Sequence, residues 1–175
     1  MTSGITMHTP SAERDTVLRR YMGGPPLLEQ TLTGLHPSDL DRSPANNGWT
    51  IRQIVHHIAD GDDIWKTCIR IGLGNEQAEF SLGWYWTLTQ TEWAECWAYS
   101  CRSLKESLDL LKANRNHVHQ LLLKKPEGWS RSVAIRDSKG VLERVTLGFV
   151  VEMQADHLFH HLNRIVEIHN QAGGT

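Results

Sequence analysis

The chain has few cysteines and no long apolar run, and both shortages exclude classes of protein. Its three cysteines, Cys68, Cys96 and Cys101, are odd in number and lack CxxC spacing, so they indicate reduced, half-buried thiols and neither a disulfide framework nor a zinc ribbon. No apolar run approaches the roughly 20 residues that cross a bilayer. Residues 1–15 also lack the basic and apolar regions of a signal peptide. We therefore expect a cytoplasmic protein without a membrane partner.

An excess of positive charge is missing as well. The 18 Lys and Arg residues face 20 Asp and Glu residues, and the net charge of −2 lacks the cationic field that gathers nucleic acid. We expect a small-molecule substrate and no nucleic-acid partner. A chain of 175 residues is long enough for one domain with a real core. We assign that domain to residues 11–172 and expect residues 1–10 to be loosely ordered or disordered.

Helical periodicity is abundant, and it covers residues 11–34, 50–73, 91–124 and 146–170. The second segment is the best delimited, because Thr50 and Gln53 match a capping box at its start and GLGN ends it. In the first segment, GGPP at residues 23–26 predicts one broken helix, since proline removes a backbone donor. In the third, Ser103 and Glu106 match a second capping box and indicate a restart of the helix.

Residues 129–146 follow a different pattern. The stretch WSRSVAIRDSKGVLERVT alternates apolar and polar residues around DSKG, which is typical of a short β-hairpin. Four helical segments with this insertion before the last one predict an all-α fold, a four-helix bundle with a small β-hairpin.

The sequence is also rich in histidine, with 10 residues, and three of them fall within DHLFHHLN at residues 156–163. Helical phase places His157 and His161 on the apolar side of the last helix and His160 on the solvent side. The spacing of i and i+4 stacks two imidazoles one turn apart, as when one helix supplies two metal ligands. The apolar side consists of Leu147, Val150, Val151, Leu158, Leu162, Ile165 and Ile168.

The adjacent pair in IVHHIAD divides in the same way. His57 falls on the apolar side of the second helix, and His56 falls nearly opposite, beside Arg70 and Asp63. Three neutral imidazoles that converge from two helices would leave a coordination position open, as in catalytic zinc or nickel sites. The apolar side here consists of Ile51, Ile54, Ile58, Trp65, Cys68, Ile69 and Gly72.

Other interpretations of these residues stay open. A single inward histidine is more often a hydrogen-bonded core residue than a ligand, and spacing alone leaves metal binding and core packing in balance. Trp93 and Trp97 lie at helical spacing and are expected to pack, whereas Trp84 and Trp86 either pack or line the mouth of a pocket. The remaining histidines are expected on the surface or in loops: His8, His36, His56, His117, His119, His160 and His169.

Together, GWTIRQIVHHIADGDD and DHLFHHLNRI resemble the DinB superfamily, closest to its YfiT-like members, which are described as candidate metal-dependent hydrolases. The likeness extends over nearly the whole chain after its first residues. It implies a four-helix bundle that holds one divalent metal, commonly nickel or zinc, through His57, His157 and His161. Related branches include bacillithiol S-transferases and mycothiol-dependent isomerases, so the resemblance also implies low-molecular-weight thiol chemistry. A homodimer is a further expectation.

The chain departs from the family pattern beside the expected site. Where YfiT-like members continue as ADSH, it has Asp60, Gly61 and Asp62, which removes a hydroxyl and an imidazole. Where the family often has a histidine in the insertion, it has Arg136. Asp60 lies three residues after His57 and is our candidate for a base or for the carboxylate that orients a metal-bound imidazole. An ordinary exposed carboxylate is the alternative.

Three functional classes follow from this reading. The first is a metal-dependent thiol S-transferase or hydrolase, in which the metal activates a small thiol or water. It is favoured because no serine or cysteine is visibly paired with an inward histidine for covalent catalysis. The second is a non-catalytic metal-binding or stress-response module. A purely structural bundle is least favoured, because it leaves the inward imidazoles unexplained.

Overall fold

The computed structural model describes residues 11–42, 48–75 and 77–172. The expectation for residues 1–10 therefore lies outside the described residues. Four long helices dominate: α1 (Ser11–Leu32), α3 (Ile51–Gly74), α5 (Leu104–Lys124) and α6 (Leu147–Ala172). The shorter elements are α2 (Pro37–Leu40), α4 (Gln90–Cys96), two 3-10 turns (Tyr85–Thr87 and Pro126–Ser130) and strands β1 (Glu79–Ser81), β2 (Ser132–Arg136) and β3 (Leu142–Thr146).

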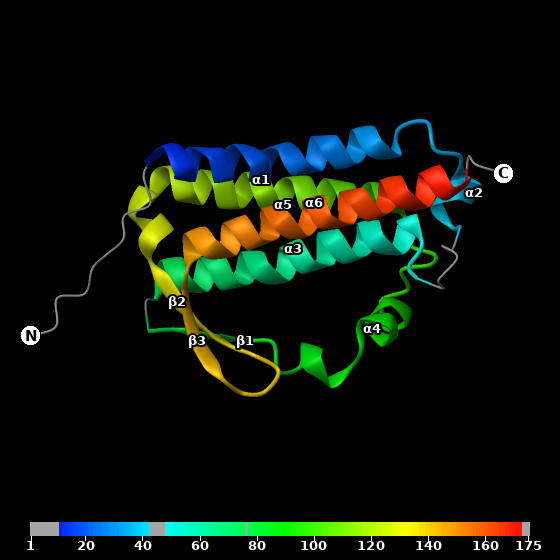
Figure 1. Cartoon of the computed structure of the whole chain (residues 1–175). Helices are drawn as coiled ribbons and strands as arrows, with labels where there is room; N and C mark the ends of the chain where they lie inside the picture. Colours follow the sequence, from blue (N-terminus) through cyan, green and yellow to red (C-terminus); the bar gives the residue numbers. More distant parts are fainter. Residues whose placement is uncertain (1–10, 43–47, 76, 173–175) are drawn as a thin grey trace, which may run out of the picture.

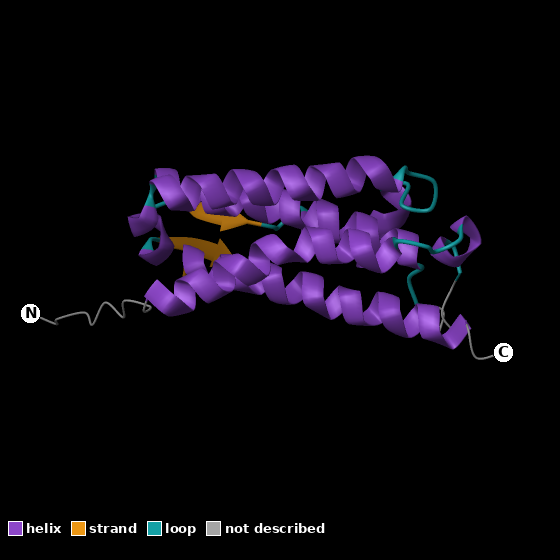
Figure 2. Ribbon diagram, turned by 90° about the horizontal axis from the view of Figure 1, so that it is seen from above, coloured by secondary structure: helices purple, strands orange, loops and turns teal. Residues whose placement is uncertain are grey.

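The four long helices run alongside one another and form the predicted bundle (Figure 1). Helix α3 packs against α5 and α6, and α1 packs against the same two helices. The small sheet packs alongside α3 and α6 toward one end of the bundle, and Figure 2 shows its strands behind the helices. The segment from β1 to α4 follows the outside of α3 (Figure 1). Within the described residues, no helix is long and apolar enough to span a membrane.

A polar layer divides the core of the bundle into two apolar clusters. One cluster lies at the sheet end and takes residues 147–155 of α6, and the other takes residues 158–168 of the same helix. The same division occurs on α5, where buried Arg115 lies between Leu111 of one cluster and Val118 of the other. Most of the buried polar side chains among the described residues belong to the layer between the clusters, and only His56 and Ser107 form a separate pair: the layer consists of His57, Asp62, Asn114, Arg115 and Gln154.

Helix α1 is continuous through GGPP, so the predicted break is wrong. Pro25 has no N–H to bond to the carbonyl of Tyr21, four residues earlier. Arg115 of α5 supplies the missing donor, since its Nη1 donates to Tyr21 O at 2.6 Å. Gly24 permits this approach, because a Cβ there would lie 2.7 Å from Arg115 Nη1. A residue from another helix thus satisfies the carbonyl that the proline leaves free.

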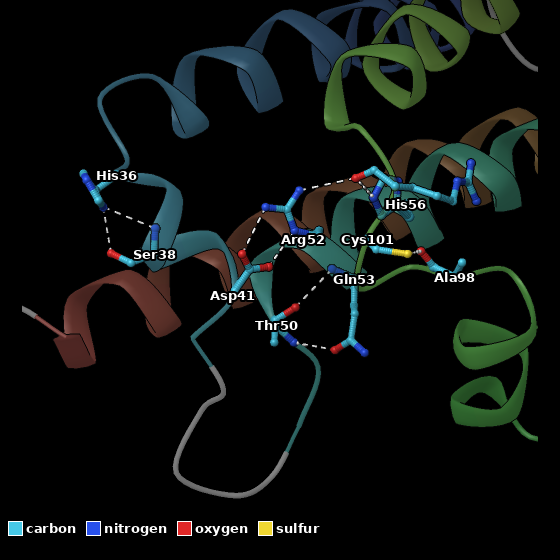
Figure 3. Close-up of polar contacts among 10 residues, drawn as sticks. His36, Ser38, Asp41, Thr50, Arg52, Gln53, His56, Ala98 and Cys101 are labelled. Atoms are coloured by element: carbon cyan, nitrogen blue, oxygen red, sulfur yellow. Dashed lines mark hydrogen bonds and ion pairs between the residues drawn. The ribbon is translucent and has the colours of Figure 1, made fainter.

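Helix α3 begins as its sequence predicts. Thr50 is the N-cap, its Oγ1 accepts from Gln53 N at 3.2 Å, and Gln53 Oε1 accepts from Thr50 N at 2.9 Å (Figure 3). One residue into the helix, Arg52 forms an ion pair with Asp41 just after α2 (Figure 3). The first turn of α3 is therefore fixed both locally and by a tertiary contact.

The third predicted segment forms two helices. Helix α4 ends at Cys96, and α5 begins at Leu104, so the restart at Ser103 is confirmed, although the Ser103 side chain does not cap the backbone. The break occurs at Ala98, whose φ of 54° lies in the left-handed region. A non-glycine residue in this conformation carries backbone strain. The sequence has no proline or glycine at this position that would have predicted the break.

The predicted hairpin is confirmed as β2 and β3, which pair antiparallel with Val133 opposite Val145. Its turn ends at Gly140, whose φ of 80° suits glycine. The sequence did not predict β1, which pairs in parallel with β2 and places Phe80 opposite Ile135. Three residues are too short a run for an alternating pattern to register.

Candidate metal centre

Three histidines meet in the bundle core between α3 and α6. His57 comes from α3, and His157 and His161 come from successive turns of α6. The Nε2 atom of His157 lies 3.0 Å from Nε2 of His57 and 3.2 Å from Nε2 of His161. One ligand atom from each ring lies within 4.8 Å of the others. The structure thus brings together the three residues that phase and resemblance singled out.

These nitrogen separations fit a shared divalent ion. Zinc–imidazole bonds are about 2.0–2.1 Å long, so two nitrogens on one ion lie about 2.9–3.4 Å apart for bond angles between a right angle and the tetrahedral value. Both separations from His157 fall in that range. Borderline ions such as zinc and nickel accept imidazole nitrogen readily.

Hydrogen bonding alone satisfies this cluster poorly. Nε2 of His157 faces two other Nε2 atoms, yet a neutral ring nitrogen has either one proton or one lone pair. It therefore makes a good hydrogen bond with only one of them. Nδ1 of His161 is buried as well, and among the described residues it has no hydrogen-bond partner. A cation that accepts all three lone pairs resolves the first of these conflicts.

Burial keeps the three rings in the neutral form that metal binding requires. The pKa values of His57, His157 and His161 are lowered to about 3, chiefly by desolvation and to a smaller extent by repulsion between the rings. The positive charge of Arg115 is a further cause of the low pKa of His157. At neutral pH each imidazole therefore has a free lone pair. Trp49 closes the far side of His57, with ring centroids 4.7 Å apart.

A cavity of about 120 Å³ opens beside the histidine cluster. His57, His157 and Gly61 form its floor, and its walls are mainly apolar and aromatic: Ile64, Trp65, Leu82, Tyr85, Trp86, Gln90, Trp97 and Tyr99. We refer to it as the inner cavity. Aromatic walls of this kind exclude water from polar groups at the floor.

A second, wider pocket of about 400 Å³ adjoins the inner cavity and shares Ile64 and Trp97 with it. Its other lining residues are Asp60, Asp63, Trp84 and Arg102. We refer to it as the outer pocket. Trp84 and Trp86 are both about half exposed, so the pocket-mouth interpretation holds for these two tryptophans. The predicted packing of Trp93 and Trp97 also holds, since their ring centroids lie 4.7 Å apart.

Asp60 lies in the outer pocket and does not line the inner cavity. Its Oδ2 accepts from Arg102 Nη1 at 2.7 Å and its Oδ1 from Arg102 Nη2 at 3.2 Å. Within the described residues, no hydrogen bond joins Asp60 to the three imidazoles. Tyr99 links the two spaces, because it lines the inner cavity and hydrogen-bonds to Asp60. Burial, with the nearby carboxylate, raises the pKa of Tyr99 and keeps its hydroxyl protonated.

The predicted exposure of His56 is wrong, because the side chain is fully buried. Figure 3 shows His56 on α3. Its Nδ1 lies 2.8 Å from Ser107 Oγ, and its Nε2 lies 3.3 Å from the carbonyl oxygen of Arg102. Burial lowers the pKa of His56 to about 4. The polar side of α3 is covered by α5 and by the chain that precedes it, which the phase of one helix does not reveal.

The other histidines follow the prediction where the structure describes them. His160 is exposed, and so are His36, His117 and His169, while His119 is half-buried. His8 lies outside the described residues. Of the cysteines, Cys68 is fully buried and Cys96 and Cys101 are exposed, so the half-buried prediction is wrong, although all three are free thiols. Sequence reasoning missed Tyr99 and Arg102, which lie in the irregular stretch between α4 and α5.

A family model of the DinB superfamily matches residues 24–165. The chain belongs to the DinB superfamily. Two curated proteins with similar sequences are named as candidate metal-dependent hydrolases. One, from Oceanobacillus iheyensis, is 29% identical over 145 residues, which cover 82% of this chain and 78% of that protein. The other, YfiT of Bacillus subtilis, is 27% identical over 150 residues, which cover 85% of this chain and 80% of YfiT.

The solved structure of YfiT confirms the fold. It superposes with a TM-score of 0.81, at 23% sequence identity, and covers 97% of this chain and 93% of its own. That protein is described as a probable metal-dependent hydrolase with an unusual four-helix bundle topology. The DinB-superfamily resemblance and the four-helix bundle predicted from the sequence are therefore both confirmed.

Proposed function

We propose that this protein is a metal-dependent hydrolase of a small organic substrate and binds one nickel or zinc ion through His57, His157 and His161. The observation that carries the proposal is that Nε2 of His157 lies at ligand-to-ligand spacing from Nε2 of both His57 and His161, and that His57 and His157 line a cavity. The names of the two curated relatives support the same class of reaction. A divalent ion supplies a Lewis acid there and makes water or a thiol nucleophilic near neutral pH.

The protein contributes binding, orientation and exclusion of water. Trp86 and Tyr85 hold the apolar part of a substrate against the histidine cluster, and the outer pocket receives its more polar part. Tyr99 lines the inner cavity, and its one hydroxyl proton is donated to the Asp60 carboxylate, so it contributes a fixed aromatic wall and not a hydrogen-bond donor to the substrate. A cavity built around the ligands favours catalysis over a storage or stress module, which needs no room beside its metal.

Asp60 acts in this proposal as a positioning residue and not as the base. Both of its oxygens accept from Arg102, and the side chain lines the outer pocket and not the inner cavity, so Asp60 is held away from the histidine cluster. Through its hydrogen bond it fixes the orientation of Tyr99. Asp60→Asn should therefore lower kcat by about tenfold or more while KM and metal content change little. Loss of metal from this variant would instead place Asp60 in the metal site.

The test of the main proposal begins with metal analysis of the purified protein, where we expect about one equivalent of nickel or zinc. Ester, amide and lactone substrates are then assayed with metal-loaded protein, first without a thiol and then with bacillithiol, mycothiol or glutathione. We expect hydrolysis that needs the metal and no thiol. The variant with all three histidines replaced should be inactive, and His160→Ala should be as active as the wild type.

Two other results of this panel would overturn the proposal. Turnover only with a thiol would establish an S-transferase. Metal binding without turnover of any substrate would establish the non-catalytic module.

A further inference from the structure

Gly61 stands in the interior of α3, where glycine is unfavourable. The residue lies between Asp60 and Asp62 with helical backbone, and it is not among the glycines with positive φ. Glycine destabilises a helix interior relative to alanine, since it loses more conformational freedom on folding. Its presence therefore calls for a reason beyond the local backbone.

Close packing explains some helical glycines of this protein, but it explains neither Gly61 nor the exposed Gly23. A Cβ at Gly24 would lie 2.7 Å from Arg115 Nη1, and one at Gly72 would lie 2.6 Å from Leu147 Cδ2. At both positions an added Cβ would force the neighbouring side chain to shift. At Gly61 the nearest atom would be Cε1 of His157, at 3.7 Å, an ordinary van der Waals distance. The protein itself thus leaves room for at least an alanine.

The room beside Gly61 belongs to the inner cavity. Gly61 lines that cavity together with His57 and His157, so a side chain there would occupy space next to the histidine cluster. A methyl group takes roughly the space of one water molecule, about 30 Å³, out of about 120 Å³. A cavity of about 150 Å³ holds benzene, so the inner cavity suits a group of roughly four or five non-hydrogen atoms.

We propose that Gly61 determines substrate size: it keeps the inner cavity open for a compact apolar group of about four or five non-hydrogen atoms, such as a short acyl chain. The bare backbone forms the floor, and Leu82 and Trp86 among others form apolar walls. The rest of the substrate reaches the outer pocket past the shared residues Ile64 and Trp97. This assignment of the substrate rests on the proposed hydrolase function, but the role of Gly61 in the space beside the metal does not.

The test uses cobalt-loaded protein and two probes of different size, azide and imidazole, with binding followed by the visible absorption of the metal. We expect wild type to bind both. Gly61→Val should weaken the binding of imidazole to the cobalt site by about tenfold or more and the binding of azide by much less, because a larger probe no longer fits without a steric clash. Gly61→Ala should also weaken imidazole binding more than azide binding, but both effects should be smaller than in Gly61→Val. Gly23→Ala is the matched control, since Gly23 is helical and exposed, with no atom near its Cβ position.

Equal effects on the two probes, or no effect on either, would overturn the proposal. So would a loss of cobalt binding by both Gly61 variants, because the glycine would then serve the metal ligands and not the ligand space. An activity series tests the substrate class separately. On acetate, butyrate and octanoate esters, wild type should accept butyrate but not octanoate, and Gly61→Val should accept only acetate. If none of these esters is hydrolysed, the assignment of a short acyl ester as substrate fails, the wider panel of amides and lactones decides the hydrolase function, and the probe titration still decides the role of Gly61.

Discussion

Two polar groups occupy the middle of the same bundle, and they differ in how the protein satisfies the nitrogen atoms at their centres. Arg115 and its partners form the first, which we term the arginine joint, and the three histidines form the second. Arg115 is fully buried, whereas among the histidines His57 is buried and the other two are partly exposed. The joint is not fully satisfied either, because Asp62 Oδ2 and Gln154 Oε1 have no hydrogen-bond partner among the described residues. The two groups are also neighbours, because Gln154 of the joint lies three residues before His157 in α6.

The arginine joint connects all four long helices. Arg115 Nε donates to Asp62 Oδ1 at 3.0 Å, Nη1 to the Tyr21 carbonyl at 2.6 Å, and Nη2 to the Gln154 carbonyl at 2.9 Å. The guanidinium also lies 4.3 Å from the centre of the Tyr21 ring. Each guanidinium nitrogen thus has a partner within the protein, which is typical of a buried cation with a structural role.

The histidine cluster has the opposite character. Its Nε2 atoms face one another, at 3.0 Å between His57 and His157 and 3.2 Å between His157 and His161, and among the described residues no other group hydrogen-bonds to them. A cavity adjoins the cluster, whereas side chains and backbone enclose Arg115 on every side. The contrast teaches that burial of polar groups does not by itself indicate function. Acceptors that converge without a donor indicate a site for a ligand.

The largest effect should come from breaking the arginine joint. Arg115→Met removes three hydrogen bonds and leaves Asp62 and two carbonyls buried without this partner, so we expect a loss of about 3–5 kcal/mol in the free energy of unfolding. Urea denaturation measures it. Arg164→Met is the control, because Arg164 is partly exposed and its ion pair with Glu167 should contribute less than about 1 kcal/mol. A comparable loss in both variants would show that the joint has no special structural role.

The joint also marks the limit of what the sequence predicted about the fold. Periodicity predicted four helices and the hairpin, because each depends on residues close together in the chain. The continuity of α1 through Pro25 depends on Arg115, which is 90 residues away. Local patterns do not contain this long-range term. The break at Ala98 was missed for another reason: its hydrogen bonds are local, with Tyr99 N donating to the carbonyl of Ala94, but the residue with positive φ is an alanine.

The candidate site shows the same division. His57, His157 and His161 could be found because ligands on amphipathic helices keep the helical phase. Tyr99 and Arg102 could not, since they precede α5 in an irregular stretch without a period. His56 was assigned to solvent by a correct phase, but α5 and Arg102 cover that side of α3. The helical phase of a residue gives the direction in which its side chain points, but it does not show which other segments of the chain pack on that side.

The adjacent residues His56 and His57 allow the next test. His57→Ala should lower metal affinity by more than about 100-fold, beyond the effect expected for a residue that only supports a ligand. His56→Ala should leave metal affinity almost unchanged but lower the free energy of unfolding by about 2 kcal/mol, because it leaves Ser107 buried without this partner. Isothermal titration with zinc and urea denaturation separate the two effects. The reverse pattern would interchange the roles of the two histidines.

The pH dependence of the free energy of unfolding tests the arginine joint without removing Arg115. Burial raises the pKa of Asp62 to about 6, above its unfolded value near 3.9, although the Arg115 guanidinium opposes the shift. Between these values the folded protein binds more protons than the unfolded chain, so Asp62 makes stability fall as pH rises from about 4 to about 6. The decrease should be on the order of 2 kcal/mol. In Asp62→Asn this part of the profile should be missing, and an identical slope in both proteins would refute the assignment.

The smallest effect is expected at His160, and it tests the boundary of the histidine cluster. His160 precedes His161 directly, and their ring centroids are 5.2 Å apart, yet His160 faces solvent. A ring on the outer face of α6 cannot direct its lone pair toward the bundle interior. His160→Ala should therefore change stability by less than about 0.5 kcal/mol and zinc affinity by less than about threefold, as expected for an exposed residue. The measurement is the same zinc titration that is used for His57→Ala. A loss at His160 as large as the loss at His57 would mean that α6 presents a different face to α3, and the three-histidine site would have to be reassigned.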